Sequence, residues 1–423
     1  MSHSTGDVGS VTKVQVGLLR LQCGIQHYAW GDPSYIPQLT GVDNSLGKPY
    51  AELWMGDHPD LPASLDGSTS LPALIAADPK QILGSAIVDR FGPQLPYLFK
   101  ILAVASPLSI QAHPSKSKAK AGFEQEDAIG VPRDASTRTY RDVNHKPELI
   151  TALTDFYALR GFRPLDELRE LLVTVPEFRG LATGFKSTKD ALRNLYRKFM
   201  EFDEQQVDSV LGPLVERLKI REALRPFELE EREYWVLKSH RAHSCERHYD
   251  RGLFSIYLLN LIHLHAGQAT YLPAGVLHAY LHGVGVELMA NSNNVLRGGL
   301  TSKHVDVPEL LQSITFDEET PVFVDPIALS ATEAAYRTPF EEFELRRIQL
   351  SDSLSHESSS ACGAEILIVI AADETGVTAR VTGSTTGDSV TLAQGQILLA
   401  THSTSYSLTA NSAATLYKAT VPT

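Results

Sequence analysis

The order of apolar and polar residues predicts strands towards both ends of the chain and helices between them. Residues 97–104 and 108–113 have the length and composition of two strands joined by a Ser-Pro turn. Residues 71–91 show a helical pattern, whereas apolar runs over 255–265 and 284–289 predict further strands. In the last part of the chain, Gly and Asp turns recur between short runs of Thr, Val and Ala, which indicates a second all-β unit.

The spacing of apolar residues changes after Pro164. Leucines and aromatic residues recur at helical spacing over 165–172 and 190–218, and Asp166 suits the first turn of a helix. We therefore predict a helical insertion over 164–240. Its simplest role is a structural cap packed on the β domain.

The pattern divides the chain into a lead, two β domains and the insertion. The predicted boundaries are 1–15 for the lead, 16–163 plus 241–325 for the first β domain, 164–240 for the insertion and 326–423 for the C-terminal β domain. The second β domain resembles the first in register, because a Gly-Gln turn precedes an apolar run at Gly267 and again at Gly395. Counted from this turn, the position of His278 holds Tyr406 in the second copy. A degenerate repeat that has lost a histidine and a chance likeness of two strand–turn–strand units both stay open.

Composition places the chain among ordinary globular proteins and narrows its partners. The 423 residues suffice for two or three domains, with 43% hydrophobic and 21% charged residues. The net charge of -12 argues against nucleic-acid binding, and no run approaches the roughly 18 apolar residues of a membrane span. The three cysteines lie far apart without a C-x-x-C pair, which indicates a reducing cytoplasm and argues against a cysteine-based zinc cluster. The polar start of the chain has no apolar h-region, so we predict a short disordered lead rather than a signal peptide.

The stretch from Gly267 to His278 carries the strongest chemical signal. Its pattern, G-x5-P-x-G-x2-H, gives a glycine turn, an apolar strand, a second turn at Pro273 and Gly275, and a histidine that starts the next strand. This order aims an imidazole into the mouth of a small β-barrel, and neutral imidazole is the commonest metal ligand among side chains. A lone histidine on a strand is more often a packing or surface residue, so the metal hypothesis depends on further ligands.

Two other stretches offer such ligands. Gln111 and His113 lie two apart on a predicted strand and therefore point to the same face. Glu148 follows Asn-His-Lys-Pro, where the proline favours an extended backbone that lets the carboxylate face a cavity. Gln-x-His is common by chance, and a solvated loop is the alternative for the second stretch. With His278, the stretches supply two nitrogen and two oxygen donors, a set that suits a catalytic zinc ion with an open position.

Other histidines compete for this role. His263 and His265 also lie two apart on a predicted strand, in a place where they can face outward. His240, His243 and His248 fall in a polar stretch that has the composition of an exposed connection. Both groups rank below the four-residue set.

Two cationic residues follow an Asn-rich turn. Arg297 is followed by Gly298 and Gly299, and Lys303 comes six residues after the arginine. Glycines let a ligand approach the backbone closely, and the two cations suit a phosphate or a developing oxyanion. The alternative is a plain turn in which Arg297 forms a surface salt bridge.

Five blocks of sequence together resemble the signature blocks of type I mannose-6-phosphate isomerases. In the family's order they are 95–100 (LPYLFK), 107–114 (PLSIQAHP), 144–148 (NHKPE), 271–278 (YLPAGVLH) and 294–301 (NVLRGGLT). Any single block is unspecific, whereas five in order over residues 20–310 are specific. The resemblance implies a mainly β chain with a cupin-type β-barrel (jelly roll) as catalytic domain, a helical insertion and a second, C-terminal cupin-like β domain.

The resemblance also implies the reaction and the residues that perform it. The reaction is the interconversion of mannose 6-phosphate and fructose 6-phosphate through a cis-enediol, with one zinc ion per chain. The implied zinc ligands are Gln111, His113, Glu148 and His278, and the implied catalytic arginine is Arg297. The substrate-binding or acid–base candidates are Lys100, Ser109, His145, Lys146, Glu287 and Lys303, and a zinc-bound water is a further candidate for the proton shuttle.

The partners and the setting follow from the same resemblance and from the composition. The expected partner is a hexose 6-phosphate, with no nucleic acid and no membrane. The chain is expected to act as a monomer in the cytoplasm. Mannose catabolism and GDP-mannose synthesis both stay open as the pathway that it serves.

Two departures from the family pattern bear on activity. The family usually has Asp where this chain has Asn293, and Ser302 replaces a frequent proline. Because an amide cannot act as a carboxylate does, a non-catalytic sugar-phosphate sensor that kept the pocket stays open as an alternative function. A metal-dependent cupin oxygenase is a second alternative, although Gln111 as a ligand argues against its His-rich iron site.

Overall fold

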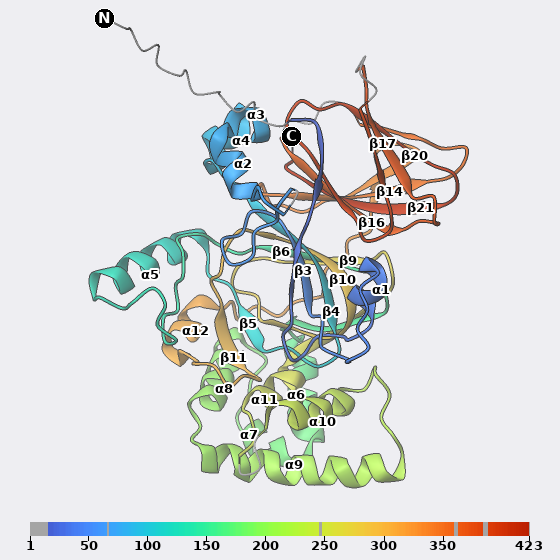
Figure 1. Cartoon of the computed structure of the whole chain (residues 1–423). Coiled ribbons are helices and arrows are strands. Elements are labelled where there is room, and N and C mark those ends of the chain that lie inside the picture. The colour runs from blue at the N-terminus through green and yellow to red at the C-terminus, as the bar shows by residue number, and fades with distance from the viewer. Residues whose placement is uncertain (1–15, 66, 245–247, 359–362, 384–387, 423) are drawn as a thin grey trace, which may run out of the picture.

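Three antiparallel sheets and a helical lobe make up the molecule (Figure 1). The computed structural model describes residues 16–65, 67–244, 248–358, 363–383 and 388–422, so the lead predicted over 1–15 lies outside the described residues. In Figure 1 a ten-stranded sheet lies in the middle, the C-terminal β unit above it and the helical lobe below it. The predicted β framework with a helical insertion is confirmed.

The central sheet is built around one long strand, β10. Its strands are β2 (Gly24–Gln26), β3 (Glu52–Met55), β4 (Tyr97–Val104), β5 (Ile110–Ala112), β6 (Glu148–Ala152), β7 (Phe156–Phe162), β8 (Leu259–Leu264), β9 (Ala269–Leu272), β10 (His278–Ala290) and β11 (Leu296–Gly299). The first half of β10 pairs with β5 and β7, and its second half pairs with β4 and β6. Pairings of the described strands branch at β10 rather than closing into one ring. β4 is buried along its whole length, which explains its nearly continuous apolar sequence.

The single long strand predicted over 255–265 is wrong in its first part. α11 (Gly252–Leu258) is a helix, and β8 begins only at Leu259. Every residue of α11 is buried, so the segment is apolar on all sides and shows no amphipathic period. A continuous apolar run of this kind does not distinguish a buried strand from a buried helix.

The helical insertion forms a lobe that is packed on the central sheet. Its helices are α6 (Leu165–Thr174), the 3-10 turn η1 (Pro176–Phe178), α7 (Arg179–Ala182), α8 (Lys189–Glu201), α9 (Glu204–Leu224) and α10 (Arg232–His243). Leu192, Leu195, Leu211 and Leu214 are buried, as their helical spacing predicts. The same apolar core includes residues of β5, β7 and β10. The lobe therefore covers the end of the sheet from which the predicted site residues come.

Shorter helices flank the sheet. They are α1 (Tyr35–Thr40), α2 (Leu71–Ala77), α3 (Pro79–Leu83), α4 (Ser85–Phe91), α5 (Lys116–Ala128) and α12 (Val307–Ser313). The helical pattern over 71–91 is divided into three helices at Asp78 and Gly84. The Asp78 side chain caps α3 by accepting from the Gln81 amide at 3.0 Å, and Gly84 has a φ of 91°, which favours glycine.

The C-terminal β unit pairs a seven-stranded sheet with a four-stranded sheet across a shared apolar core. Its strands are β12 (Ile327–Ala328), β13 (Glu333–Tyr336), β14 (Glu344–Leu350), β15 (His356–Ser358), β16 (Glu365–Ala371), β17 (Val377–Val381), β18 (Ser389–Leu392), β19 (Ile397–Ala400), β20 (Tyr406–Ala410) and β21 (Ala414–Thr420). β1 (Leu18–Leu21) pairs with β19 in the larger sheet. The first described strand thus belongs to the sheet of the C-terminal unit, while the domain boundaries given above stay a prediction.

The two Gly-Gln turns adopt the same geometry in both β units. Gly267 and Gly395 have positive φ, at 90° and 77°. In each turn the glutamine side chain accepts from a backbone amide three residues earlier, at 3.0 Å in the first and 3.1 Å in the second. β10 starts at His278 and β20 starts at Tyr406, as the repeat predicts. The Tyr406 hydroxyl donates to Glu365 at 2.6 Å, so the second unit holds a hydrogen-bonded tyrosine where the first holds an imidazole.

A buried aspartate after β3 gives the fold a pH-dependent stability. Asp57 accepts from the Leu95 amide at 2.9 Å, and burial raises its pKa to about 6. An unfolded aspartate has a pKa of about 3.9, so between about pH 4 and pH 6 the unfolded chain loses this proton first, and the free energy of unfolding falls as the pH rises. In the unsubstituted chain, the free energy of unfolding measured with urea should fall by about 3 kcal/mol across this pH window. We expect Asp57→Asn to abolish this fall. Parallel pH profiles for the two proteins would contradict the assignment.

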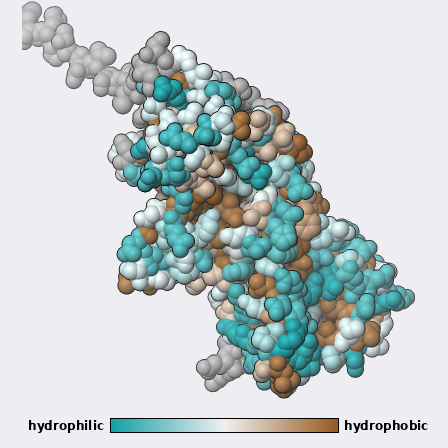
Figure 2. Space-filling view, turned by 90° about the vertical axis from the view of Figure 1, so that its right-hand side faces the viewer, coloured by the Kyte–Doolittle hydropathy of each residue, from teal (hydrophilic) through white to brown (hydrophobic). Residues whose placement is uncertain are grey.

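No helix in the described part of the chain is long and apolar enough to cross a membrane. On the face shown in Figure 2, hydrophobic side chains lie in groups between hydrophilic ones. Exposed large apolar residues such as Leu46, Ile129 and Leu224 come from separate parts of the chain.

Candidate metal centre and pocket

The strand register brings three of the predicted site residues into one row. β5 lies between β10 and β11, and Gln111 is the direct partner of His278 on one side and of Arg297 on the other. His113 lies just after β5, and Glu148 is the first residue of β6, which pairs with the other half of β10. Sheet pairing therefore gathers residues that are far apart in the sequence.

His113, Glu148 and His278 form a buried centre with the spacing of metal ligands. Their exposed fractions are 1%, 2% and 1%. His113 Nε2 lies 3.2 Å from Glu148 Oε1, and His278 Nε2 lies 3.4 Å from Glu148 Oε2. Zinc–ligand bonds of about 2.0–2.1 Å in a tetrahedral arrangement place ligand atoms about 3.3 Å apart. The three side chains are thus spaced as zinc ligands are.

The second nitrogen of each imidazole fixes where its proton lies. His113 Nδ1 donates to the Asn294 carbonyl at 2.8 Å, and His278 Nδ1 donates to the Val276 carbonyl at 2.9 Å. A carbonyl only accepts, so Nε2 of each neutral ring presents a lone pair. Both Nε2 atoms are buried without a hydrogen-bond partner. Two lone pairs that face a carboxylate repel it unless a cation lies between them, so these residues fit a zinc ion.

Burial and charge keep the centre in the protonation state that binds a metal. Burial lowers the pKa of His113 to about 4, so the ring is neutral near pH 7. Burial by itself raises the pKa of the Glu148 carboxyl, but the positive charge of Lys146 opposes this shift, and the pKa lies well below its usual value. Lys146 Nζ lies 3.3 Å from Glu148 Oε1. Neutral imidazoles and a charged carboxylate are what metal binding requires.

A cavity of about 400 Å³ lies beside the metal centre. The predicted residues that line it are Lys100, Ser109, Gln111, Lys146, Glu148, Glu287, Arg297 and Lys303. His145 does not line the cavity: its Nε2 lies 2.6 Å from Glu342 Oε1, and this contact argues against the acid–base role that the sequence suggests for His145. His243, which the sequence places in an exposed connection, does line the cavity and contacts the Pro107 carbonyl at 2.7 Å.

Glu287 and Lys100 form a buried ion pair in the wall of the cavity. They are direct partners across β10 and β4, and Lys100 Nζ lies 3.0 Å from Glu287 Oε2. Burial raises the pKa of the Glu287 carboxyl, although Lys100 opposes the shift. A carboxyl group with a raised pKa holds a proton more readily than a free one, which suits a group that accepts and returns a proton.

Arg297 and Lys303 give the cavity a positive charge. Burial, followed by the neighbouring Arg141, lowers the pKa of Arg297, and burial with both arginines lowers the pKa of Lys303. Arg297 still remains charged, because an arginine is not deprotonated in a protein. No described carboxylate lies within ion-pair distance of Arg297 or Lys303. Unpaired cations in a partly buried cavity favour an anionic ligand.

The two glycines after Arg297 permit close packing against α8 and α11. A Cβ atom on Gly299 would lie 2.5 Å from Gly252 Cα, and one on Gly298 would lie 2.9 Å from the Tyr196 hydroxyl. Neither glycine lines the cavity. The expectation that these glycines let a ligand approach the backbone is therefore not met.

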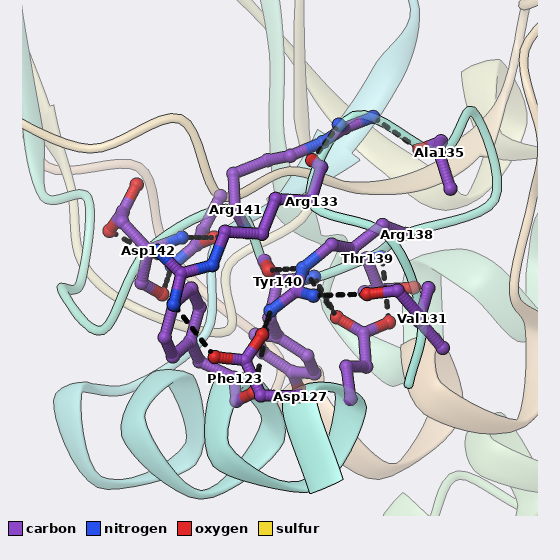
Figure 3. Close-up of polar contacts among 12 residues, drawn as sticks. Phe123, Asp127, Val131, Arg133, Ala135, Arg138, Thr139, Tyr140, Arg141 and Asp142 are labelled. Carbon is purple, nitrogen blue, oxygen red and sulfur yellow. Dashed lines mark hydrogen bonds and ion pairs between the residues drawn. The ribbon is translucent and has the colours of Figure 1, made fainter. Parts of the chain in front are cut away.

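A network of arginines fixes the loop that leads from α5 to β6 (Figure 3). The buried Arg138 donates to the carbonyls of Val131 and Tyr140, each at 2.7 Å, and to Asp127 Oδ1 at 2.8 Å. Arg141 donates to the Ala135 carbonyl at 2.9 Å on the same loop (Figure 3). This loop continues into the segment that carries Lys146 and Glu148.

Asn294 joins the same loop to the metal centre and was missed by sequence reasoning. Its side-chain oxygen accepts from the Arg141 amide at 2.7 Å, and its NH2 group donates to the carbonyls of Asp142 and Asn144, each at 2.8 Å. Its own carbonyl accepts from His113 Nδ1. Its signals in the sequence are its place in the Asn-rich turn before Arg297 and its position as the first residue of the block 294–301.

We expect Asn294→Ala to weaken zinc binding by about 10- to 100-fold, the usual effect of losing an outer-shell partner. The variant keeps the carbonyl that orients His113 but loses the side-chain bonds that hold this carbonyl in place. Turnover should recover at saturating zinc. Competition with a chromophoric chelator measures the affinity, and Asn194→Ala, an exposed substitution on α8, is the control. Equal affinities of the two variants would refute the role.

The departure at Asn293 lies beside a carboxylate. Asn293 Nδ2 donates to Asp60 Oδ2 at 3.2 Å, and both residues line the cavity. The negative charge that is absent at position 293 is therefore present on a neighbouring side chain. Ser302 also lines the cavity, next to Lys303, whose amide donates to Thr301 Oγ1 at 3.1 Å.

This fold and this site define a metal-dependent enzyme of the cupin class with a cationic pocket. Residues 18–165 match the family described as phosphomannose isomerase type I, catalytic domain. The chain is 37% identical over 359 residues to mannose-6-phosphate isomerase of Escherichia coli K12, which covers 83% of this chain and 88% of that protein. Mannose-6-phosphate isomerase 1 of Arabidopsis thaliana is 32% identical to this chain over 429 residues. The match covers 95% of this chain and 93% of the Arabidopsis protein. The chain belongs to the mannose-6-phosphate isomerase family.

A solved structure supports the same conclusion. Mannose 6-phosphate isomerase from Salmonella typhimurium, bound to substrate (f6p) and zinc, matches with a TM-score of 0.83 and 29% identity. The match covers 96% of this chain and 100% of that one. The likeness therefore includes the helical lobe and the C-terminal unit.

Proposed function

We propose that this chain interconverts mannose 6-phosphate and fructose 6-phosphate with one bound zinc ion. The observation that carries the proposal is the pair of buried Nε2 lone pairs that converge on the Glu148 carboxylate beside a cationic cavity. His113, Glu148 and His278 would hold the zinc, with Gln111 as the fourth ligand, since it is the strand partner of His278. The names of the bacterial and plant relatives support the reaction.

The reaction requires charge stabilisation and a proton transfer. After the sugar ring opens, a proton moves between C1 and C2, and negative charge develops on the adjacent oxygens of the cis-enediol. Zinc would act as a Lewis acid that stabilises this charge. Arg297 adds a fixed positive group whose orientation is set before the reaction begins, because it lies on β11 directly opposite Gln111.

Glu287 is the better placed of the two remaining acid–base side chains. It lines the cavity, its pKa is raised by burial, and Lys100 holds its carboxylate at 3.0 Å. Lys146, the other candidate, is held 3.3 Å from Glu148 Oε1. We therefore assign the proton transfer between C1 and C2 to Glu287, and to Lys146 the positioning of the Glu148 carboxylate.

The phosphate of the substrate would bind to the remaining polar groups of the cavity. Lys303 supplies an ammonium group and Ser109 a hydroxyl, and both line the same cavity as Arg297. Burial and the mutual repulsion of these cations lower the pKa of Arg297 and of Lys303, and a dianionic phosphate would relieve the repulsion among Arg297, Lys303 and Arg141. This arrangement explains why an acidic chain can bind an anionic sugar.

A coupled assay of mannose 6-phosphate conversion tests the proposal. Chelator treatment should abolish the conversion, and re-addition of zinc should restore it. The untreated enzyme and a magnesium re-addition serve as controls. A zinc-loaded protein without conversion would favour the sugar-phosphate sensor instead.

We also propose that the chain acts as a monomer in the cytoplasm. Cys23 is a free thiol, which is consistent with a reducing compartment. Light scattering across a concentration series tests the monomer, because a higher mass at high concentration would contradict it.

A further inference from the structure

A second group of potential metal ligands lies outside the catalytic cavity. Asp155 lies between β6 and β7, and two histidines at the end of β8 face it. His263 Nε2 lies 2.9 Å and His265 Nδ1 3.2 Å from the same oxygen, Asp155 Oδ1. All three ligand atoms lie within 4.8 Å of one another. The side chains of Asp155 and His265 are each 68% exposed, so an ion in solution can reach the group.

The chemistry of the group is that of a transition-metal site. Ligand atoms of a tetrahedral zinc ion lie about 3.3 Å apart, and the distances here resemble the 3.2 and 3.4 Å of the catalytic centre. Two imidazole nitrogens and one carboxylate oxygen suit zinc, copper or nickel rather than calcium or magnesium. The exposed side leaves room for a water molecule as the fourth ligand.

Neighbouring contacts hold one of these imidazoles in place. His263 is the strand partner of Tyr157, and the two rings stack with centroids 4.3 Å apart and an angle of 11° between the planes. The Tyr157 hydroxyl donates to Glu230 Oε1 at 2.7 Å, which fixes the tyrosine in turn. Because these contacts already order the His263 ring, metal binding costs less side-chain conformational entropy at this ligand.

The group lies at the opposite end of β6 from the catalytic centre. Glu148 is the first residue of β6, whereas Asp155 comes three residues after its last residue, Ala152. At about 3.3 Å per residue, β6 alone separates the two positions by about 13 Å. An ion bound at Asp155 therefore cannot contact the substrate. It would instead link the turn after β6 to the end of β8.

We propose that Asp155, His263 and His265 form a second, exchangeable binding site for a divalent transition metal, zinc in the first instance. The site binds more weakly than the buried centre, because two of its ligands are exposed and must be ordered by the ion. It is independent of the isomerase proposal and uses none of the residues of the cavity.

Titration of the zinc-loaded full chain with Co²⁺ tests the proposal through the visible absorption of the cobalt ion. We expect one further equivalent to bind and the Tm to rise with added Zn²⁺. Asp155→Asn and His265→Gln should each abolish the further equivalent and the zinc-dependent rise in Tm, while the first zinc and turnover stay unchanged. His27→Gln removes an exposed histidine outside both groups and should retain both effects.

Two results would overturn the proposal. One is the absence of a saturable equivalent beyond the catalytic zinc, and the other is an equivalent that persists in both variants. Because the histidine–aspartate contacts can stabilise the fold without a metal, each Tm is measured with and without added Zn²⁺. A loss of Tm that is the same in both conditions would show a purely hydrogen-bonded cluster and would also refute the site.

Discussion

His278→Ala is expected to release the catalytic zinc and to abolish turnover. His278 Nε2 is one of two lone pairs directed at the Glu148 carboxylate, and no other described imidazole besides His113 reaches that carboxylate. Losing an outer-shell partner weakens metal sites by about 10- to 100-fold, so removal of a direct ligand should exceed that range. Metal analysis after dialysis should find well below one equivalent of zinc.

The control for this substitution comes from the same strand. His282 lies four residues further along β10 and does not line the cavity, so His282→Ala should keep one equivalent of zinc and full turnover. Far-UV circular dichroism of both variants separates metal loss from unfolding. A folded His278→Ala protein with a full complement of zinc would remove His278 from the ligand set.

The three residues of the metal centre could be predicted from local sequence because His113, Glu148 and His278 each lie at or next to a strand end, close to a turn signal. His278 follows the Pro273 and Gly275 turn, and Gly275 adopts a φ of 81° that favours glycine. Gln111 and His113 lie two apart along an extended segment. These are short-range properties. The pairing of β5 with β10 and β11, and of β6 with β10, required the fold.

The supporting residues could not be predicted in this way, because their roles depend on contacts between distant segments. Asn294 contacts His113 across 181 positions in the sequence, and Asn293 contacts Asp60 across 233. An asparagine in a polar turn carries no sign of such a partner. The same limit explains His145, whose neighbour Lys146 lines the cavity although the side chain of His145 pairs with Glu342.

The prediction of a single strand over 255–265, where the structure has a helix up to Leu258, failed for a different physical reason. A strand and a helix that are buried on all sides have the same apolar composition, and only an amphipathic period distinguishes them. α11 packs within the core that joins the lobe to the sheet. None of its faces is exposed to solvent, so its sequence contains no polar face that would reveal a helical period. In the lobe itself, where α8 has one exposed face, the helical spacing of Leu192 and Leu195 predicts the structure correctly.

Arg297→Ala is expected to lower kcat by about 10³-fold while zinc remains bound, the effect of removing a preorganised donor from a developing oxyanion. Arg297 lies beside Gln111 in the strand register but contributes no ligand atom, so the metal should be unaffected. Its guanidinium has no ion-pair partner among the described residues, and its removal therefore leaves no carboxylate unpaired. The loss should consequently appear in turnover rather than in stability.

The matched variant Arg297→Lys separates two roles of this residue. A lysine keeps the positive charge but lacks the planar fork of the guanidinium. If Arg297 acts on the oxyanion, kcat should remain low in the lysine variant while KM changes little. If it binds mainly the phosphate, the lysine should restore much of kcat/KM and the alanine variant should show its defect in KM. A near-normal rate in Arg297→Ala would exclude both roles. The carboxylate of Asp60 and the ion pair of Glu287 with Lys100 would then be the remaining charged groups to test in the same cavity.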